Sequence, residues 1–244
     1  MSLKYQNYNE PGPEELEEIQ NAAVERSSPP YYTYALLGCI VAVTAAQFAH
    51  GLEDSILLAG FVKPQFLHAH EYWRILTGAA LHGGLLHLFM NGYALLGFGR
   101  LVEMLSNRAH LAIVFLLSAI GGGLLSLWAV PGGISVGASG GIVGLISYLA
   151  VYAFRRRKFI SYEFRKSLLM NIGFIIVFGL VLYQVIDNYG HIGGLIVGAI
   201  YGFIQIPSDE YVDPREAGTP AEIAGLVAMG IYIATALFSI WLII

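Results

Sequence analysis

The chain has 244 residues, of which 56% are hydrophobic and only 12% are charged. With a mean hydropathy of +0.63, this composition lies outside the range of an ordinary soluble domain and predicts a protein embedded in a lipid bilayer. The formal net charge of −4 says little about partners, and we expect no nucleic-acid ligand. A single cysteine, Cys39, excludes an intramolecular disulfide and a cysteine-based metal site, and we expect no metal or cofactor.

The predicted elements are seven apolar helices, each near the roughly 20 residues that cross about 30 Å of hydrocarbon. Residues 1–30 precede them and are polar and acidic; they lack the pattern of a cleavable signal peptide and are expected to be a flexible cytoplasmic tail. A polar linker, 207–221, separates the six-span core, 31–206, from the seventh helix, 222–244. The predicted fold class is therefore an all-α polytopic membrane protein. The expected spans are about 31–50, 80–103, 109–130, 139–154, 168–186, 190–206 and 222–244.

The positions of lysine and arginine predict the orientation of these spans. With the N-terminus in the cytoplasm, only Lys63 and Arg74 of the 13 basic residues lie on the outer side. Cytoplasmic loops of membrane proteins are enriched in these residues. We therefore expect a multi-pass protein of a bacterial inner (plasma) membrane with a cytoplasmic N-terminus.

Two outer segments differ from ordinary polar loops. The first, 51–79, is apolar enough to lie in the membrane interface. The second, 131–138, contains Pro131-Gly132-Gly133 and cannot form a regular helix, although it leads directly into the fourth span. Irregular backbone at membrane depth is tolerated only against protein or a water-filled cavity.

A serine and a histidine open two of the apolar helices. Ser139 lies 16 residues before Arg155, and His191 lies 16 residues before Pro207, which is about 24 Å of helix in both cases. Both helices run inward, so the two side chains reach the same depth. Neutral imidazole can take the serine proton near pH 7, which predicts Ser139 as nucleophile and His191 as base. Asp187 is expected only to cap the start of the histidine helix.

Glycines give these two helices a way to meet. Gly194 and Gly198 share a helical face near His191, and Gly140 directly follows Ser139. Small residues at this spacing let helix backbones approach closely, and the same pattern is common as a plain packing motif. Together with a serine and a histidine at matched depth, it predicts contact between nucleophile and base.

Acyl transfer also requires hydrogen-bond donors directed at the developing oxyanion. His87 and Asn91 are four residues apart on one face of the second span and are assigned to this oxyanion site. His82 is rotated about 140° from His87, or precedes the helix, and is expected to hold the neighbouring loop. A lone intramembrane histidine or asparagine often makes only an interhelical hydrogen bond, but four polar residues converging at one depth favour function.

These residues resemble the rhomboid family of intramembrane serine proteases over about residues 30–206. The resemblance implies a six-helix core, a Ser139–His191 dyad, an oxyanion site of His87, Asn91 and the Ser139 N–H, and cleavage of substrate helices near their outer ends. It rests on Trp73-Arg74, His82, His87, Asn91, Gly97, Glu103, Gly137-Ala138-Ser139-Gly140, Asp187-Asn188, His191-Ile192-Gly193-Gly194 and Gly198. We expect structural roles near the site for His82, Trp73, Arg74, Gly137, Gly140, Gly194 and Gly198.

Two positions depart from the family pattern. Gly78 stands where some bacterial members have an additional histidine. Val143 stands where many members have an aromatic ring against the catalytic histidine, which we expect to lower the rate by orienting His191 less firmly.

The sequence therefore predicts a serine endopeptidase whose partners are transmembrane protein substrates and the lipid bilayer. The alternative is a catalytically inactive rhomboid-like protein that binds membrane clients. A small transporter is a further alternative, but no sequence repeat or midplane polar site supports it. The sequence does not indicate the substrate, the oligomeric state, or the roles of the tail and the seventh helix.

Overall fold

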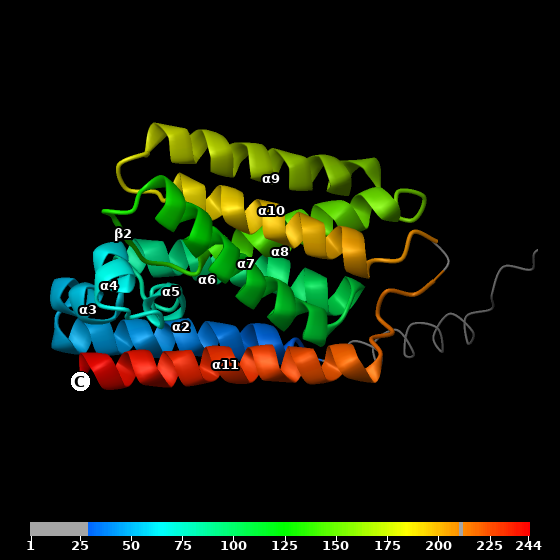
Figure 1. Ribbon diagram of the computed structural model, residues 1–244. Coiled ribbons are helices and arrows are strands. Elements are labelled where there is room, and N and C mark those ends of the chain that lie inside the picture. The colour runs from blue at the N-terminus through cyan, green and yellow to red at the C-terminus, as the bar shows by residue number, and fades with distance from the viewer. Residues whose placement is uncertain (1–28, 210–211) are drawn as a thin grey trace, which may run out of the picture.

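The computed structural model describes residues 29–209 and 212–244, which form a bundle of long helices (Figure 1). Most of the predicted N-terminal tail, residues 1–28, lies outside the described residues. The long helices are α2 Tyr31–His50, α6 Leu85–Leu105, α7 Arg108–Ala129, α8 Ser139–Arg155, α9 Tyr162–Val181, α10 Asn188–Gln205 and α11 Thr219–Ile243. Shorter elements are α3 Leu52–Ala59, β1 Phe61–Val62, α4 Lys63–His68, α5 Arg74–Thr77 and β2 Ile134–Ser135.

Five of these helices are long and apolar enough to cross a membrane: α2, α6, α7, α9 and α11. The helix α8 is apolar but has only 17 residues. A helix corresponds to each of the seven predicted stretches, so the all-helical, multi-helix class is confirmed.

Three predicted helix boundaries are wrong by five or six residues, and one of them is the end of the fifth long helix, which lies at Val181 rather than near 186. The second long helix begins at Leu85 rather than near residue 80, because Gly84 has φ +140° and interrupts the helical backbone. The fifth begins at Tyr162 rather than near 168, because the Ser161 hydroxyl accepts a hydrogen bond from the Phe164 N–H and caps a first turn too polar for the apolar pattern to reveal.

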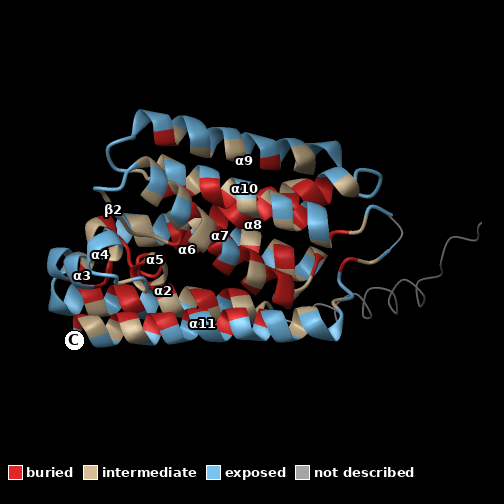
Figure 2. Cartoon of the chain, in the orientation of Figure 1, coloured by how far each residue is buried: buried red, intermediate tan, exposed pale blue. Residues whose placement is uncertain are grey.

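The buried centre of the bundle consists of α7, α8 and α10 (Figure 2). The helix α8 is buried on all sides from Gly141 to Leu149, whereas most of α9 is exposed at one edge. At the other edge, α11 lies along α2. Ser139 therefore begins the helix with the longest continuous buried stretch among the described residues.

The two predicted outer segments, 51–79 and 131–138, are joined to each other. Strands β1 and β2 pair antiparallel, with Phe61 opposite Ser135, and the Gly137 N–H donates to the Gly78 carbonyl at 2.9 Å. A Cβ at Gly78 would lie 2.6 Å from the Phe61 Cβ, so this turn admits only glycine without a shift. The prediction that 131–138 is not a regular helix is confirmed.

Candidate active site

The helices α8 and α10 cross at glycines, where the backbone of one helix lies against the backbone of the other. A Cβ added at Gly194 would collide with the Gly140 carbonyl oxygen and lie 3.0 Å from its carbonyl carbon. A Cβ added at Gly198 would collide with the Gly144 oxygen and lie 2.7 Å from that carbonyl carbon. The two backbones are therefore in direct contact over two successive turns, as the small-residue stripe predicts.

This crossing sets the positions of Ser139 and His191. Ser139 immediately precedes Gly140, and His191 lies one turn before Gly194. The Gly190 carbonyl oxygen would lie 3.5 Å from a Cβ at Gly140, so the first turns of the two helices adjoin. Ser139 and His191 are both partly exposed.

The Ser139 hydroxyl and the His191 ring make no hydrogen bond with one another in the part of the chain that the structure describes. The His191 Nδ1 atom is buried without a hydrogen-bond partner. The ring lies within electrostatic range of Asp187 and of His87. Hydrogen bonds between catalytic groups are often long in unliganded enzymes and shorten when substrate binds. The adjoining first turns of α8 and α10 are therefore compatible with a hydrogen bond between Ser139 and His191 in a substrate complex.

His87 and Asn91 face the turn that leads into Ser139. Gly137 has φ +125°, and a Cβ there would lie 2.8 Å from the His87 Nε2 and 3.8 Å from the Asn91 Nδ2. A side chain at this position would therefore both strain the backbone and collide with the imidazole. The predicted oxyanion residues are thus adjacent to the turn that precedes the predicted nucleophile, Ser139.

The hydrogen bonds of His87 and Asn91 leave donors available on the side of this turn. The Gly83 N–H donates to the His87 Nδ1 at 3.3 Å, so a neutral ring bears its proton on Nε2, the nitrogen close to Gly137. The Asn91 Nδ2 donates one hydrogen to the His87 carbonyl at 3.1 Å and retains a second. Both side chains can thus donate to an anion near Ser139.

His82 precedes α6 and is fully buried in the loop before it. Its backbone N–H donates to the Gln47 side chain at 2.9 Å, and its carbonyl accepts from the same amide at 3.1 Å. Its Nδ1 lies 3.3 Å from the Thr44 hydroxyl, and its ring meets the His87 ring edge-on at 5.1 Å. These contacts fix the loop beside His87.

Asp187 caps α10 and also connects it to the outer segments. Its Oδ1 accepts from the Gly190 N–H at 2.9 Å, as a cap requires. Its Oδ2 accepts from the hydroxyls of Ser126, at 2.5 Å, and Ser135, at 2.6 Å. The Lys63 ammonium donates to the Ser126 hydroxyl at 2.7 Å. Sequence reasoning missed Lys63, Ser126 and Ser135 at this site.

Lys63 is only 2% exposed, although it belongs to a predicted outer segment. Burial lowers the pKa of its ammonium, and the nearby Asp187 carboxylate opposes that shift. Arg74, the other basic residue predicted outside, is only 5% exposed. Lys63 and Arg74 are the two basic residues predicted on the outer side, and both are buried. Their isolation in the sequence could therefore have indicated a structural role.

Comparison with known proteins identifies the family of the chain. A family model described as "Rhomboid domain" matches residues 69–208, which is more than half of the chain. The chain belongs to the rhomboid family. As a family member with several candidate spans, it is a multi-pass integral membrane protein.

Individual rhomboid relatives differ in their stated activity. RHOMBOID-like protein 6, mitochondrial, of Arabidopsis thaliana is 34% identical over 57% of this chain and 46% of its own length. Rhomboid protease GluP of Bacillus subtilis is 33% identical over 72% of this chain and 35% of its own length. Inactive rhomboid protein 1 of Papio anubis is 29% identical over 67% and 19%, respectively. The chain thus spans less than half of each of these relatives.

In this rhomboid protein, Trp73 and Arg74 organise the outer segment. The Arg74 Nη1 donates to the carbonyls of Leu57, at 3.1 Å, and Gly60, at 2.8 Å. Its guanidinium lies 4.6 Å from the Trp73 ring centre, and Trp73 packs edge-on against Phe238 of α11. These contacts of Trp73 and Arg74 are with segment 51–79 and α11, as expected for residues with a structural role.

No group of three or more histidine, cysteine, aspartate or glutamate side chains among residues 29–209 and 212–244 is arranged to hold a metal ion.

Proposed function

We propose that this rhomboid protein is an intramembrane serine endopeptidase that cleaves transmembrane segments of other membrane proteins. The observation that supports it best is the backbone contact of α8 and α10 at Gly140 and Gly194, which brings the helix starts with Ser139 and His191 together. The similarity to Rhomboid protease GluP supports the same reaction.

In the proposed reaction, the Ser139 Oγ attacks the carbonyl carbon of the scissile peptide while His191 takes its proton. The negative charge that develops on the carbonyl oxygen accepts hydrogen bonds from the His87 Nε2–H, the Asn91 amide and the Ser139 N–H. The last of these is available because the first N–H groups of a helix have no intrahelical partner. Each such donor is usually worth about 3 kcal/mol of transition-state stabilisation.

His191 then gives its proton to the leaving amine, and an ester joins the substrate to Ser139. A water molecule, deprotonated by His191, hydrolyses this ester and restores the serine. This sequence requires no metal or cofactor. A helical substrate carbonyl is blocked and already hydrogen-bonded, so the substrate has to unwind locally. We propose that small, helix-destabilising residues are preferred there.

We propose a six-span core with α11 as a seventh span, and a cytoplasmic N-terminus in a bacterial inner membrane. The distribution of lysine and arginine supports this orientation. It places Ser139 near the outer face, so the substrate is cut near its outer end.

A catalytically inactive, client-binding rhomboid protein is the second candidate. The absence of a hydrogen bond between Ser139 and His191 in the described structure favours it, as does the similarity to Inactive rhomboid protein 1. The presence of both dyad residues argues against it.

Two assays on reconstituted full-length protein distinguish these functions. Cleavage of a labelled transmembrane substrate is compared for wild type, Ser139→Ala and His191→Ala, with Ser147→Ala as a control that removes another hydroxyl of α8. A fluorophosphonate probe tests whether Ser139 is an activated nucleophile. We expect wild type and Ser147→Ala to cleave and to be labelled, and both dyad variants to be inactive. Cleavage by Ser139→Ala at the wild-type rate would eliminate the proposed mechanism. Client binding without cleavage or labelling would establish the second candidate.

A further inference from the structure

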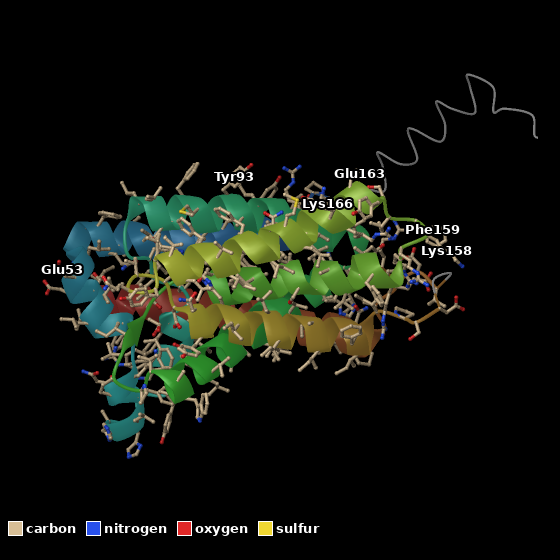
Figure 3. The ribbon with its side chains drawn as sticks, turned by 90° about the horizontal axis from the view of Figure 1, so that it is seen from above. Glu53, Tyr93, Lys158, Phe159, Glu163 and Lys166 are labelled. Atoms are coloured by element: carbon tan, nitrogen blue, oxygen red, sulfur yellow. The ribbon has the colours of Figure 1, made fainter. Side chains whose placement is uncertain are left out.

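A separate cavity of about 280 Å³ lies at the end of the bundle opposite Ser139. It is formed where α6 and α8 end and where the chain passes to α11. Figure 3 shows Phe159, from its wall, at the end of the molecule opposite Glu53 of the outer helix α3. Its lining includes Met104, Tyr152, Arg156, Phe159, Asp213 and Arg215.

Arg156 is a buried cation on the wall of this cavity and is only 3% exposed. Its Nη1 and Nη2 donate to the carbonyls of Asp209, at 2.6 Å, and Val212, at 2.7 Å. Its Nε is buried and has no hydrogen-bond partner. Carbonyl dipoles satisfy N–H groups but do not neutralise a full positive charge, so the site favours an anion.

The other polar groups of the cavity reinforce this preference. The Asp213 carboxylate is paired with Arg215, with the Arg215 Nη2 2.6 Å from its Oδ2. Among the described residues that line the cavity, that pair leaves the charge of Arg156 without a carboxylate of its own. The Tyr152 hydroxyl lies one helical turn before Arg156, within electrostatic range of both arginines, and makes no hydrogen bond in the described part of the chain. Among the described residues that line the cavity, two arginines and one tyrosine hydroxyl thus accompany a single carboxylate.

Apolar side chains of the same cavity are open to the surroundings of the bundle. Met104 is 58% exposed and Phe159 is 61% exposed. An anion site beside exposed apolar groups matches a molecule with a charged head and hydrocarbon chains. Basic pockets at the cytoplasmic side of membrane helices recognise such headgroups.

We propose that this cavity binds the phosphate group of an anionic phospholipid. Arg156 and the Tyr152 hydroxyl contact the phosphate, Arg215 adds positive charge at its edge, and the acyl chains run along Met104 and Phe159. This site is independent of the proposed proteolytic activity.

The test measures binding of dioleoyl phosphatidylglycerol to delipidated full-length protein by native mass spectrometry. Arg156→Gln removes the central charge, and Tyr152→Phe removes one donor while leaving Arg156 and its carbonyl contacts in place. Arg157→Gln is the matched control, because Arg157 is exposed, adjacent and outside the cavity. Thermal unfolding confirms that each variant is folded.

We expect Arg156→Gln to weaken lipid binding about tenfold or more and Tyr152→Phe by a smaller factor of about three, with Arg157→Gln close to wild type. Inorganic phosphate is the second probe. Displacement of the lipid by millimolar phosphate identifies a site for phosphate from either source, and resistance to displacement identifies the lipid as the ligand. Equal weakening by Arg156→Gln and Arg157→Gln, or binding of neither probe to wild type, would overturn the proposal.

Discussion

Replacing Gly194 with alanine tests whether backbone contact between α8 and α10 positions the proposed dyad. The added Cβ would lie 3.0 Å from the Gly140 carbonyl carbon and 3.2 Å from its Cα, and closer still to its oxygen. Ordinary contacts of this kind are about 3.5–4 Å, so the helices must separate by several tenths of an ångström to about 1 Å. The obstacle is backbone and cannot rotate away.

The expected effects on stability and activity differ in size. Overpacking lowers the free energy of unfolding by about 1–3 kcal/mol, and the higher helix propensity of alanine offsets up to about 1 kcal/mol of that loss. The net loss of stability is therefore modest. A displacement near 1 Å between nucleophile and base can reduce the rate about 100-fold. We expect Gly194→Ala to remain folded and to cleave a transmembrane substrate roughly 100 times more slowly than wild type.

Gly173→Ala is the matched control, because nothing lies within 4 Å of a Cβ at that position of α9. The assay compares cleavage rates of wild type and both variants in the same liposomes, together with their melting temperatures. If Gly194→Ala cleaved as fast as Gly173→Ala, close backbone approach would not be what positions Ser139 and His191.

Three further changes test other parts of the structure. Lys63→Met removes the buried ammonium that contacts Ser126, so we expect a loss of about 2 kcal/mol or more in thermal unfolding, and an unchanged melting temperature would contradict this. Tyr232→Phe leaves the buried Ala79 carbonyl without its donor at 3.1 Å, and we expect a loss of about 1–3 kcal/mol by the same measurement; a variant as stable as wild type would refute the role of this bond. The Arg215 hydrogen bond lowers the pKa of Asp213 below 3.8, so this pair stabilises the folded state above about pH 4 and the contribution disappears as pH falls through the lowered pKa. Asp213→Asn should flatten that part of an acid-unfolding curve, and an identical curve for the variant would show that the pair contributes nothing.

The sequence predicted the features that depend on local pattern. Ser139 was expected at the start of an apolar helix, and it is the first residue of α8. The glycine stripe predicted close helix approach, and the contact of Gly194 with Gly140 confirms it. These predictions succeed because helical periodicity and residue size act within one element.

Contacts between distant segments could not be predicted in the same way. Lys63 and Asp187 are 124 positions apart, and nothing in their local sequence indicates that Ser126 lies between them. The start of α6 was misplaced for a different reason, because the positive φ of Gly84 is a backbone state that hydropathy does not encode. Tertiary hydrogen bonds and special backbone angles account for most of what was missed.

The hydrogen bond from the Gly137 N–H to the Gly78 carbonyl also makes one amide a reporter of the site. Hydrogen exchange at such an amide requires the bond to open. Because Gly137 lies two residues before Ser139 and Gly78 lies in segment 51–79, deuterium uptake at residue 137 measures how often the turn before Ser139 separates from that segment. This measurement needs no substrate, and it can be made on the Ser139→Ala variant as readily as on wild type.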